Sequence, residues 1–313
     1  MMNKRLISIV TPTYNEIDNI KELYARITSS IVKLRNNYEF EVICIDNAST
    51  DGTVGLLKEM AQEDKSFKVI LNRRNFGHIR SPYYGILQAS GDAVIYLASD
   101  LQDPPELIPR FIAEWEQGYK LIMATKPASK DNKALFRLRK AYYDILDSMS
   151  EVSIVKDSTG FGLYDREVLD HIKEINDPYP FLRGLICELG YEVKAIPFTQ
   201  PKRIRGISKN NFYSLYDIAM LGLISHSKVP MRIAAFSGFI VGLMSIIAAS
   251  IYALLKVVFW SSIPIGVAPI LIGVFFLIGM TMVMIGVLGE YVASIHIYIQ
   301  NRPIVVEKAR INF

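Results

Sequence analysis

The chain has 313 residues, a length typical of about two domains, and half of its residues are hydrophobic. Its net charge of +4 is too small to indicate binding of nucleic acid through overall positive charge. Two cysteines, Cys44 and Cys187, provide no disulfide framework or zinc site. No G-x-G-x-x-G turn follows the first expected strand, and no P-loop, H-E-x-x-H or G-x-S-x-G signature occurs, so dinucleotide, P-loop, zinc-protease and serine-hydrolase chemistry lack their usual anchors.

Expected strands and helices alternate along the first 125 residues. We expect strands in LISIV, FEVICI, FKVILN, DAVIYLA and KLIMAT, and helices over about 15–35, after a cap at Ser49 or Thr50, over 80–89, and from Pro105 to about Gln117. Because the strands are near-continuous apolar runs, this pattern predicts a mostly parallel sheet with helices on both faces. Right-handed crossovers bring the carboxyl ends of such strands to one edge, where α/β proteins bind ligands.

Three polar segments, TPTYNE, DNASTD and SDLQD, follow these strands and are expected to meet at that edge. Asp46 is placed either to accept hydrogen bonds from a nucleotide or to cap its own turn. Asp100 and Gln102 offer oxygen atoms to a divalent cation that binds a diphosphate. Asp103 precedes two prolines and Glu106, so it fits a helix cap as well as a ligand.

The composition changes near Pro230. Residues 233–260 and 265–292 are two apolar runs, each longer than the roughly 18 residues needed to cross a bilayer, and residues 233–300 carry only Lys256 and Glu290 as charges. The turn SSIPIG between them has no basic residue, whereas basic residues flank both runs. The positive-inside rule then places both termini in the cytoplasm and the turn between the two runs outside, with the chain passing twice through a membrane. The alternative is a buried helical hairpin inside a soluble core.

The motifs TPTYNE, IDNASTDGT, NRRNFGH, ASDLQDPPELI, FLRG and RGISK, followed by two membrane spans, resemble the family 2 inverting glycosyltransferases. More narrowly, the chain is similar to the bacterial polyprenyl-phosphate glycosyltransferases, relatives of dolichyl-phosphate mannose synthase. The resemblance implies a GT-A fold, a Rossmann-like sheet with helices on both faces. It also implies transfer of a sugar from a nucleotide-sugar to the phosphate of a membrane polyprenyl phosphate, for cell-envelope glycan modification.

The same resemblance implies roles for individual residues. It assigns Pro12, Tyr14, Glu16, Asp46, Asn75, Gly77 and Asp100 to the nucleotide-sugar, Asp100, Asp103 and Arg137 to catalysis, Asp100 and Gln102 to Mg²⁺ or Mn²⁺, and Arg139, Arg205, Ser208 and Lys209 to the lipid phosphate. We expect a catalytic domain over 1–208, an interfacial helix over 209–230, membrane spans within 231–300 and a cytoplasmic tail over 301–313. The lipid bilayer is an expected partner and nucleic acid is not; a homo-oligomer is left open.

The chain departs from the family pattern in two places. Ala98 stands where relatives have the first acid of Asp-x-Asp, and Thr159-Gly160-Phe161-Gly162 stands where many have Gly-Asp-Phe-Arg. The departures leave open a subgroup with altered metal use, or a weakly active relative that serves as a nucleotide-sugar- or lipid-binding scaffold. A processive polysaccharide synthase is a further alternative, although its Q-x-x-R-W signature is absent.

Overall fold

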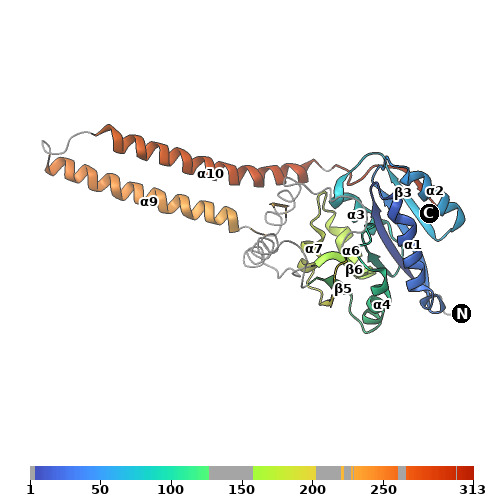
Figure 1. The fold of residues 1–313 in the computed structure, drawn as a ribbon. Coiled ribbons are helices and arrows are strands. Elements are labelled where there is room, and N and C mark those ends of the chain that lie inside the picture. Colours follow the sequence, from blue (N-terminus) through green and yellow to red (C-terminus); the bar gives the residue numbers. More distant parts are fainter. Residues whose placement is uncertain are drawn as a thin grey trace.

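The structure is a computed structural model that describes residues 4–126, 158–201, 220–221, 227, 229–259, 266–300 and 302–313. An αβ domain lies at one end of the molecule, and two long helices project from it side by side (Figure 1). After the second long helix the chain returns to the αβ domain, where its C-terminus lies. Arg137, Arg139, Arg205, Ser208 and Lys209 lie outside the described residues.

The five strands expected from the first 125 residues are all present. The elements are β1 (Arg5–Thr13), α1 (Ile17–Ile31), the 3-10 helix η1 (Leu34–Asn36), β2 (Tyr38–Asp46), α2 (Thr53–Glu63), β3 (Phe67–Asn72), α3 (Gly77–Gln88), β4 (Ala93–Tyr96), the 3-10 helix η2 (Pro105–Leu107), α4 (Ile108–Glu116), β5 (Leu121–Thr125), β6 (Ser158–Asp165), α6 (Arg166–Ile175), α7 (Leu182–Glu188), β7 (Val193–Pro197), α9 (Val229–Val258), α10 (Val267–Ile299) and β8 (Glu307–Ile311). The expected cap at Ser49 or Thr50 is wrong. Gly52, with φ +95°, precedes α2, because a left-handed residue is needed where the β2–α2 loop turns into the helix.

The strands form one sheet in the order β7-β5-β6-β4-β1-β2-β3-β8. Neighbours among β1 to β4 pair in parallel, as do β5 and β7, whereas β6 and β8 run antiparallel to the strands beside them. The sheet is therefore mostly parallel, as the sequence predicts. Thr13, Asp46, Asn72, Tyr96 and Thr125 end their strands along one edge, which we call the strand-end edge.

Helices cover both faces of this sheet. On one face, α1, α2 and α4 contribute Leu23, Leu57 and Phe111 to a core cluster with alternate residues of the strands. On the other face, α3, α6 and α7 contribute Tyr83, Leu169 and Ile186 to a second cluster. All six of these helix residues are buried. This is the layered α/β architecture that the near-continuous apolar strands predict.

Residues 301–313, expected as a tail, contribute an edge strand to the sheet. β8 pairs antiparallel with β3, and Asn312 Nδ2 donates hydrogen bonds to the backbone oxygens of Ala61 and Phe67 (2.6 and 2.8 Å). The αβ domain therefore includes residues that precede the long helices in the chain and residues that follow them. The chain enters the helical hairpin from this domain and comes back to it.

The helices α9 and α10 have 30 and 33 residues, lengths of roughly 45–50 Å at 1.5 Å per residue. Each contains a stretch long and apolar enough to cross a membrane, Val229–Ala248 and Phe276–Ile299, and none of either stretch is buried inside the protein. The two helices pack closely at Gly238, because a Cβ there would lie 2.8 Å from Met284 Cε. A hairpin buried in a soluble core, the alternative reading of these segments, does not agree with this exposure.

Candidate functional site

The loops after β1 and β2 are tied together at the strand-end edge. Asn15, with φ +56°, donates its backbone N–H to Ser49 Oγ and accepts from the Thr50 N–H through Oδ1, both at 2.8 Å. The backbone N–H of Asn47 donates to Thr13 O at 2.9 Å. These bonds hold the TPTYNE and DNASTD segments side by side, as expected from the parallel sheet.

Asp46 is the last residue of β2 and is 1% exposed. Its Oδ2 accepts from the Ser49 N–H (3.0 Å), whereas its buried Oδ1 has no hydrogen-bond partner among the described residues. Burial raises the pKa of this carboxyl above its ordinary value, although hydrogen bonds from Ser49 and Ala48 oppose the shift. Asp46 thus caps its own turn through Oδ2, as one of the two sequence interpretations predicts. Its Oδ1 remains available to accept a hydrogen bond from a ligand.

Asn47 was missed by the sequence reasoning, and it connects Asp46 to the loop that follows β3. Its Nδ2 donates to Asn75 Oδ1 (2.8 Å) and Gly77 O (3.1 Å), and its Oδ1 accepts from the Phe76 N–H (2.8 Å). Asn75 and Gly77 are therefore held beside the end of β2, where the resemblance places the nucleotide-sugar. The only sequence signal was the position of Asn47 directly after Asp46.

Pro12, Tyr14 and Glu16 lie in or just after the end of β1, each partly exposed. Tyr14 and Glu16 are near the Asn15 bridge, and Glu16 Oε2 accepts from the side chain of Asn19. All three thus lie on the strand-end edge with Asp46.

The loop after β4 carries the SDLQD residues. Asp100 is partly exposed and its Oδ1 accepts from the Gln102 N–H (3.2 Å), while Leu101 between them has φ +63° and is buried. Gln102 Nε2 donates to Pro201 O (3.4 Å). Asp100 and Gln102 therefore lie close together, in a loop held partly by the segment after β7.

Asp103 is not the helix cap that the two prolines allowed. It is 3% exposed, and its Oδ2 accepts from the Ala98 N–H (3.0 Å), while Pro104 precedes η2 without a side-chain cap. Burial, opposed by the Ala98 bond and reinforced by Asp100, raises the pKa of Asp103 to about 7. The loop thus holds a second acid besides Asp100. This acid is Asp103, which bonds the backbone of Ala98, the position at which relatives have the first acid of Asp-x-Asp.

Arg183 brings a positive charge to the same edge. Its Nη1 donates to Ser158 O at the start of β6 (3.0 Å). Burial and then Arg183 lower the pKa of His78, at the start of α3. Burial, Asp103 and Asp100 raise the pKa of Tyr96, and Arg183 lowers it. The hydrogen bond places Arg183 at the start of β6, the strand that pairs with β4.

The two glycines that depart from the family pattern have structural roles in β6. Gly160 has φ +90°, a conformation that a residue with a Cβ rarely adopts. A Cβ on Gly162 would overlap the carbonyl oxygen of Ile122 in β5. The backbone of this sheet therefore excludes an arginine at position 162, and Arg183 in the FLRG motif supplies a guanidinium nearby.

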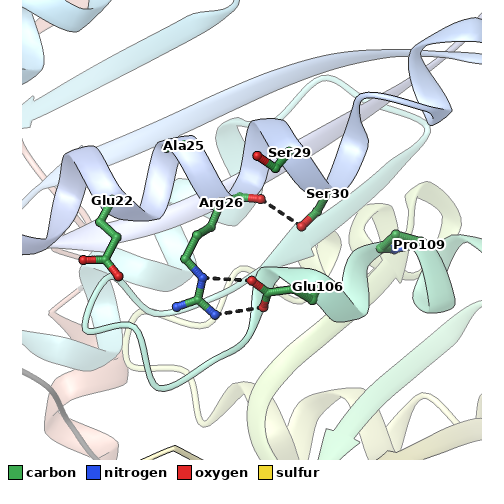
Figure 2. Close-up of a pocket in the computed structure, with 7 residues that line it drawn as sticks. All are labelled: Glu22, Ala25, Arg26, Ser29, Ser30, Glu106 and Pro109. Carbon is green, nitrogen blue, oxygen red and sulfur yellow. Dashed lines mark hydrogen bonds and ion pairs between the residues drawn. The ribbon is translucent and has the colours of Figure 1, made fainter.

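A hollow of about 450 Å³ lies elsewhere, between α1 and the segment formed by η2 and α4 (Figure 2). Arg26 crosses it and donates from Nε and Nη2 to the two carboxylate oxygens of Glu106, at 2.9 and 2.8 Å (Figure 2). None of the residues assigned to the donor or the metal, all of which the structure describes, lines this hollow. Within the described ranges, no three His, Cys, Asp or Glu side chains are grouped to hold a metal ion.

Residues 8–173 match the glycosyl transferase family 2, and the chain belongs to this family. It is therefore a glycosyltransferase, with the GT-A architecture of that family. Three relatives align along nearly the whole chain. An uncharacterized glycosyltransferase of Synechocystis sp. is 32% identical over 95% of this chain and 93% of its own length.

Glycosyltransferase YkcC of Bacillus subtilis, also uncharacterized, is 30% identical over 96% of this chain and 93% of its own. The SfII prophage-derived bactoprenol glucosyl transferase of Shigella flexneri is 30% identical over 95% and 96%. Among solved structures, a mannosyltransferase from Pyrobaculum calidifontis in complex with GDP-Man and Mn²⁺ is 14% identical over 96% of this chain and 88% of that chain, with a TM-score of 0.46. That likeness is too distant to bear on what this chain binds.

Proposed function

We propose that this glycosyltransferase moves a sugar from a nucleotide-sugar to the phosphate of a membrane polyprenyl phosphate. The observation that supports this most is the strand-end edge, with Asp46, Asn75 and the acids of the β4 loop, in a chain that also carries two membrane-length helices. The name of the Shigella relative, a bactoprenol glucosyl transferase aligned over almost the whole chain, points to the same acceptor class.

In this proposal the donor lies along the strand-end edge. The unpartnered Oδ1 of Asp46 accepts a hydrogen bond from the nucleoside, and the Asn47-supported loop with Asn75 and Gly77 covers it. Pro12, Tyr14 and Glu16, in the neighbouring loop, complete this side of the pocket. Hydrogen bonds of Asn15 and Asn47 hold in place the loops that contact the two faces of the donor. The folded protein therefore orients the donor without a further loss of loop entropy on binding.

The diphosphate of the donor would lie at the β4 loop. Asp100 and Gln102 supply oxygen atoms suited to Mg²⁺ or Mn²⁺, with the remaining ligands from water and the diphosphate. Such a cation, when bound, neutralises charge on the leaving nucleotide diphosphate. Asp103 keeps the β4 loop closed through its hydrogen bond from Ala98, and Arg183 adds a positive charge at the start of β6. The acceptor phosphate is already an anionic nucleophile, so the site needs little general base.

The acceptor would approach from the membrane. Tyr298 of α10 donates to Asp177 Oδ2 (3.0 Å), so this end of the hairpin lies against the αβ domain. Tyr291 donates to Ser227 O (2.7 Å), just before α9, and links the two long helices. With the hairpin spanning the inner membrane twice, the αβ domain and both termini share the cytoplasmic side, which the flanking basic residues favour. Arg137, Arg139, Arg205, Ser208 and Lys209 are our candidates for the acceptor side.

The test uses the purified full chain, undecaprenyl phosphate and a panel of radiolabelled nucleotide-sugars with Mg²⁺, Mn²⁺ or EDTA. A sugar-lipid that extracts into organic solvent in one reaction would support the proposal and name the donor. Asp100→Ala should abolish its formation while the protein still inserts into membranes. Nucleotide-sugar binding without product from any donor would contradict the proposal and favour the scaffold.

A further inference from the structure

Arg74, in the loop between β3 and α3, and Arg80, in the first turn of α3, form an arginine pair that makes no ion pair with an acidic side chain of the described residues. The Arg74 guanidinium carbon lies 4.2 Å from the centre of the Phe76 ring, and that of Arg80 lies 5.5 Å from the same centre. Two guanidinium groups thus share one aromatic ring, which holds them close together despite their like charge. A guanidinium that stacks on a ring keeps its positive charge and its N–H donors, which match the oxygen atoms of a phosphate.

Arg302, in the segment that follows α10 in the chain, adds a third positive charge. It follows the last residue of α10, Ile299, by three positions, and Arg80 Nη2 donates to the oxygen of the next residue, Pro303. Burial is the first cause of the lowered pKa of Arg80, and the positive charges of Arg74 and Arg302 lower it further. Arg74, Arg80 and Arg302 together are called the arginine cluster below.

The other arginines packed on this domain contrast with the cluster. Arg26 pairs with Glu106 and Arg310 with Glu307, at 2.8 and 2.6 Å. In the part of the chain that the structure describes, no ion pair includes a member of the cluster, and the buried Nε of Arg80 has no hydrogen-bond partner. The cluster therefore has charge and a hydrogen-bond donor that its own fold does not use.

The position of the cluster defines the ligand. The candidate membrane-spanning stretch of α10 ends at Ile299, three residues before Arg302, so the cluster lies next to the end of the hairpin that meets the αβ domain. Phosphate groups of lipids are the anions at a membrane surface, and the paired N–H donors of arginine suit them. We propose that the arginine cluster binds the phosphate group of a membrane lipid, at a site separate from Arg205, Ser208 and Lys209. The proposal rests on the membrane insertion proposed above, and not on transfer activity.

The experiment uses the full chain in nanodiscs of phosphatidylcholine with a minor fraction of phosphatidylglycerol, followed by native mass spectrometry of the lipids that remain bound. Arg74→Gln with Arg302→Gln should lower retention of phosphatidylglycerol by about fivefold for each arginine removed. Arg80 stays in place because it also holds Pro303 O. Arg35→Gln with Arg110→Gln, an equal loss of charge at two other exposed arginines, should leave retention unchanged.

A second measurement separates two sources of lipid phosphate. If transfer is active, the KM for undecaprenyl phosphate is measured for the same variants. A raised KM with unchanged phosphatidylglycerol retention would mean that the cluster holds the acceptor, and reduced retention with an unchanged KM would mean that it holds bulk phospholipid; both support a lipid-phosphate site. Unchanged retention and unchanged KM, in a double variant that melts like the wild type, would overturn the proposal. Retention needs no donor, so it remains informative if no transfer is found.

Discussion

Replacing Asp103 with asparagine should change how the stability of the αβ domain depends on pH. Asp103 is 3% exposed, and burial is the main reason that its pKa is raised from 3.8 to about 7. The folded protein therefore keeps this proton at pH values at which the unfolded chain has released it. The stabilising contribution is complete below the unfolded pKa and is lost as the pH rises towards 7.

The size of the effect follows from the two pKa values. A shift of about three pKa units corresponds to about 4 kcal/mol at most. Between pH 5 and pH 8, linkage predicts that the wild type loses about 2.5 kcal/mol of unfolding free energy through this group. In a domain of this size, 1 kcal/mol shifts Tm by about 2–4 °C. The difference in Tm between the wild type and Asp103→Asn should therefore change by about 5–10 °C from pH 5 to pH 8. Asparagine does not titrate, so its Tm lacks this component.

The assay is thermal unfolding of the full chain in detergent with EDTA, followed by circular dichroism from pH 5 to pH 8. Asp64→Asn is the control. Burial raises the pKa of Asp64, but hydrogen bonds from Tyr24 and Ser66 outweigh burial and leave it lowered. Its contribution is lost only as the pH falls into the acid range, so its gap to the wild type should stay constant from pH 5 to pH 8. If Tm changed with pH in the same way in the wild type and in Asp103→Asn, Asp103 would not be protonated in the folded protein.

Three further changes test the sheet, the donor loop and the returning strand. Gly162→Ala should lower the unfolding free energy by about 1–3 kcal/mol through overlap with Ile122 O, whereas Gly55→Ala, with nothing near its added Cβ, should raise Tm; equal effects would contradict the packing argument. Asp46→Asn should weaken nucleotide-sugar binding about tenfold or more in calorimetry, and unchanged affinity would remove Asp46 from the pocket. Asn312→Ala should speed hydrogen exchange of the β8 and β3 amides, and unchanged exchange would show that β8 is held by its ladder alone.

The apolar strands and their polar ends were predictable because they depend on local pattern. Each buried parallel strand needs a continuous apolar run, so FEVICI and FKVILN identify β2 and β3 without tertiary information. The right-handed crossover then places Asp46 and Asp100 on one edge for topological reasons. The two long helices were equally visible, because a bilayer requires a length and composition that few soluble segments have.

Contacts between distant residues were not predictable in this way. Asp103 fits a helix cap in the sequence, but the folded loop buries it under Ala98, five residues earlier. Asn47 resembles an ordinary turn residue until β3 places Asn75 and Gly77 against it. In the sequence, Gly162 stands where many relatives have an arginine, and nothing nearby explains it. The reason is the carbonyl oxygen of Ile122 in β5, some 40 residues away in the chain, which leaves no room for a Cβ.

The sequence by itself determined the class of fold, the sheet edge on which the proposed site residues meet and the two apolar helices. These follow from periodicity and hydrophobicity, which act on each segment independently of the rest. Tertiary structure alone decided that β8 pairs with β3, that Arg183 bonds the start of β6, and that Arg74 and Arg80 share the Phe76 ring while Arg80 bonds the oxygen of Pro303. Burial and Coulomb interactions between groups depend on their distances in space, and those distances exist only once the chain has folded.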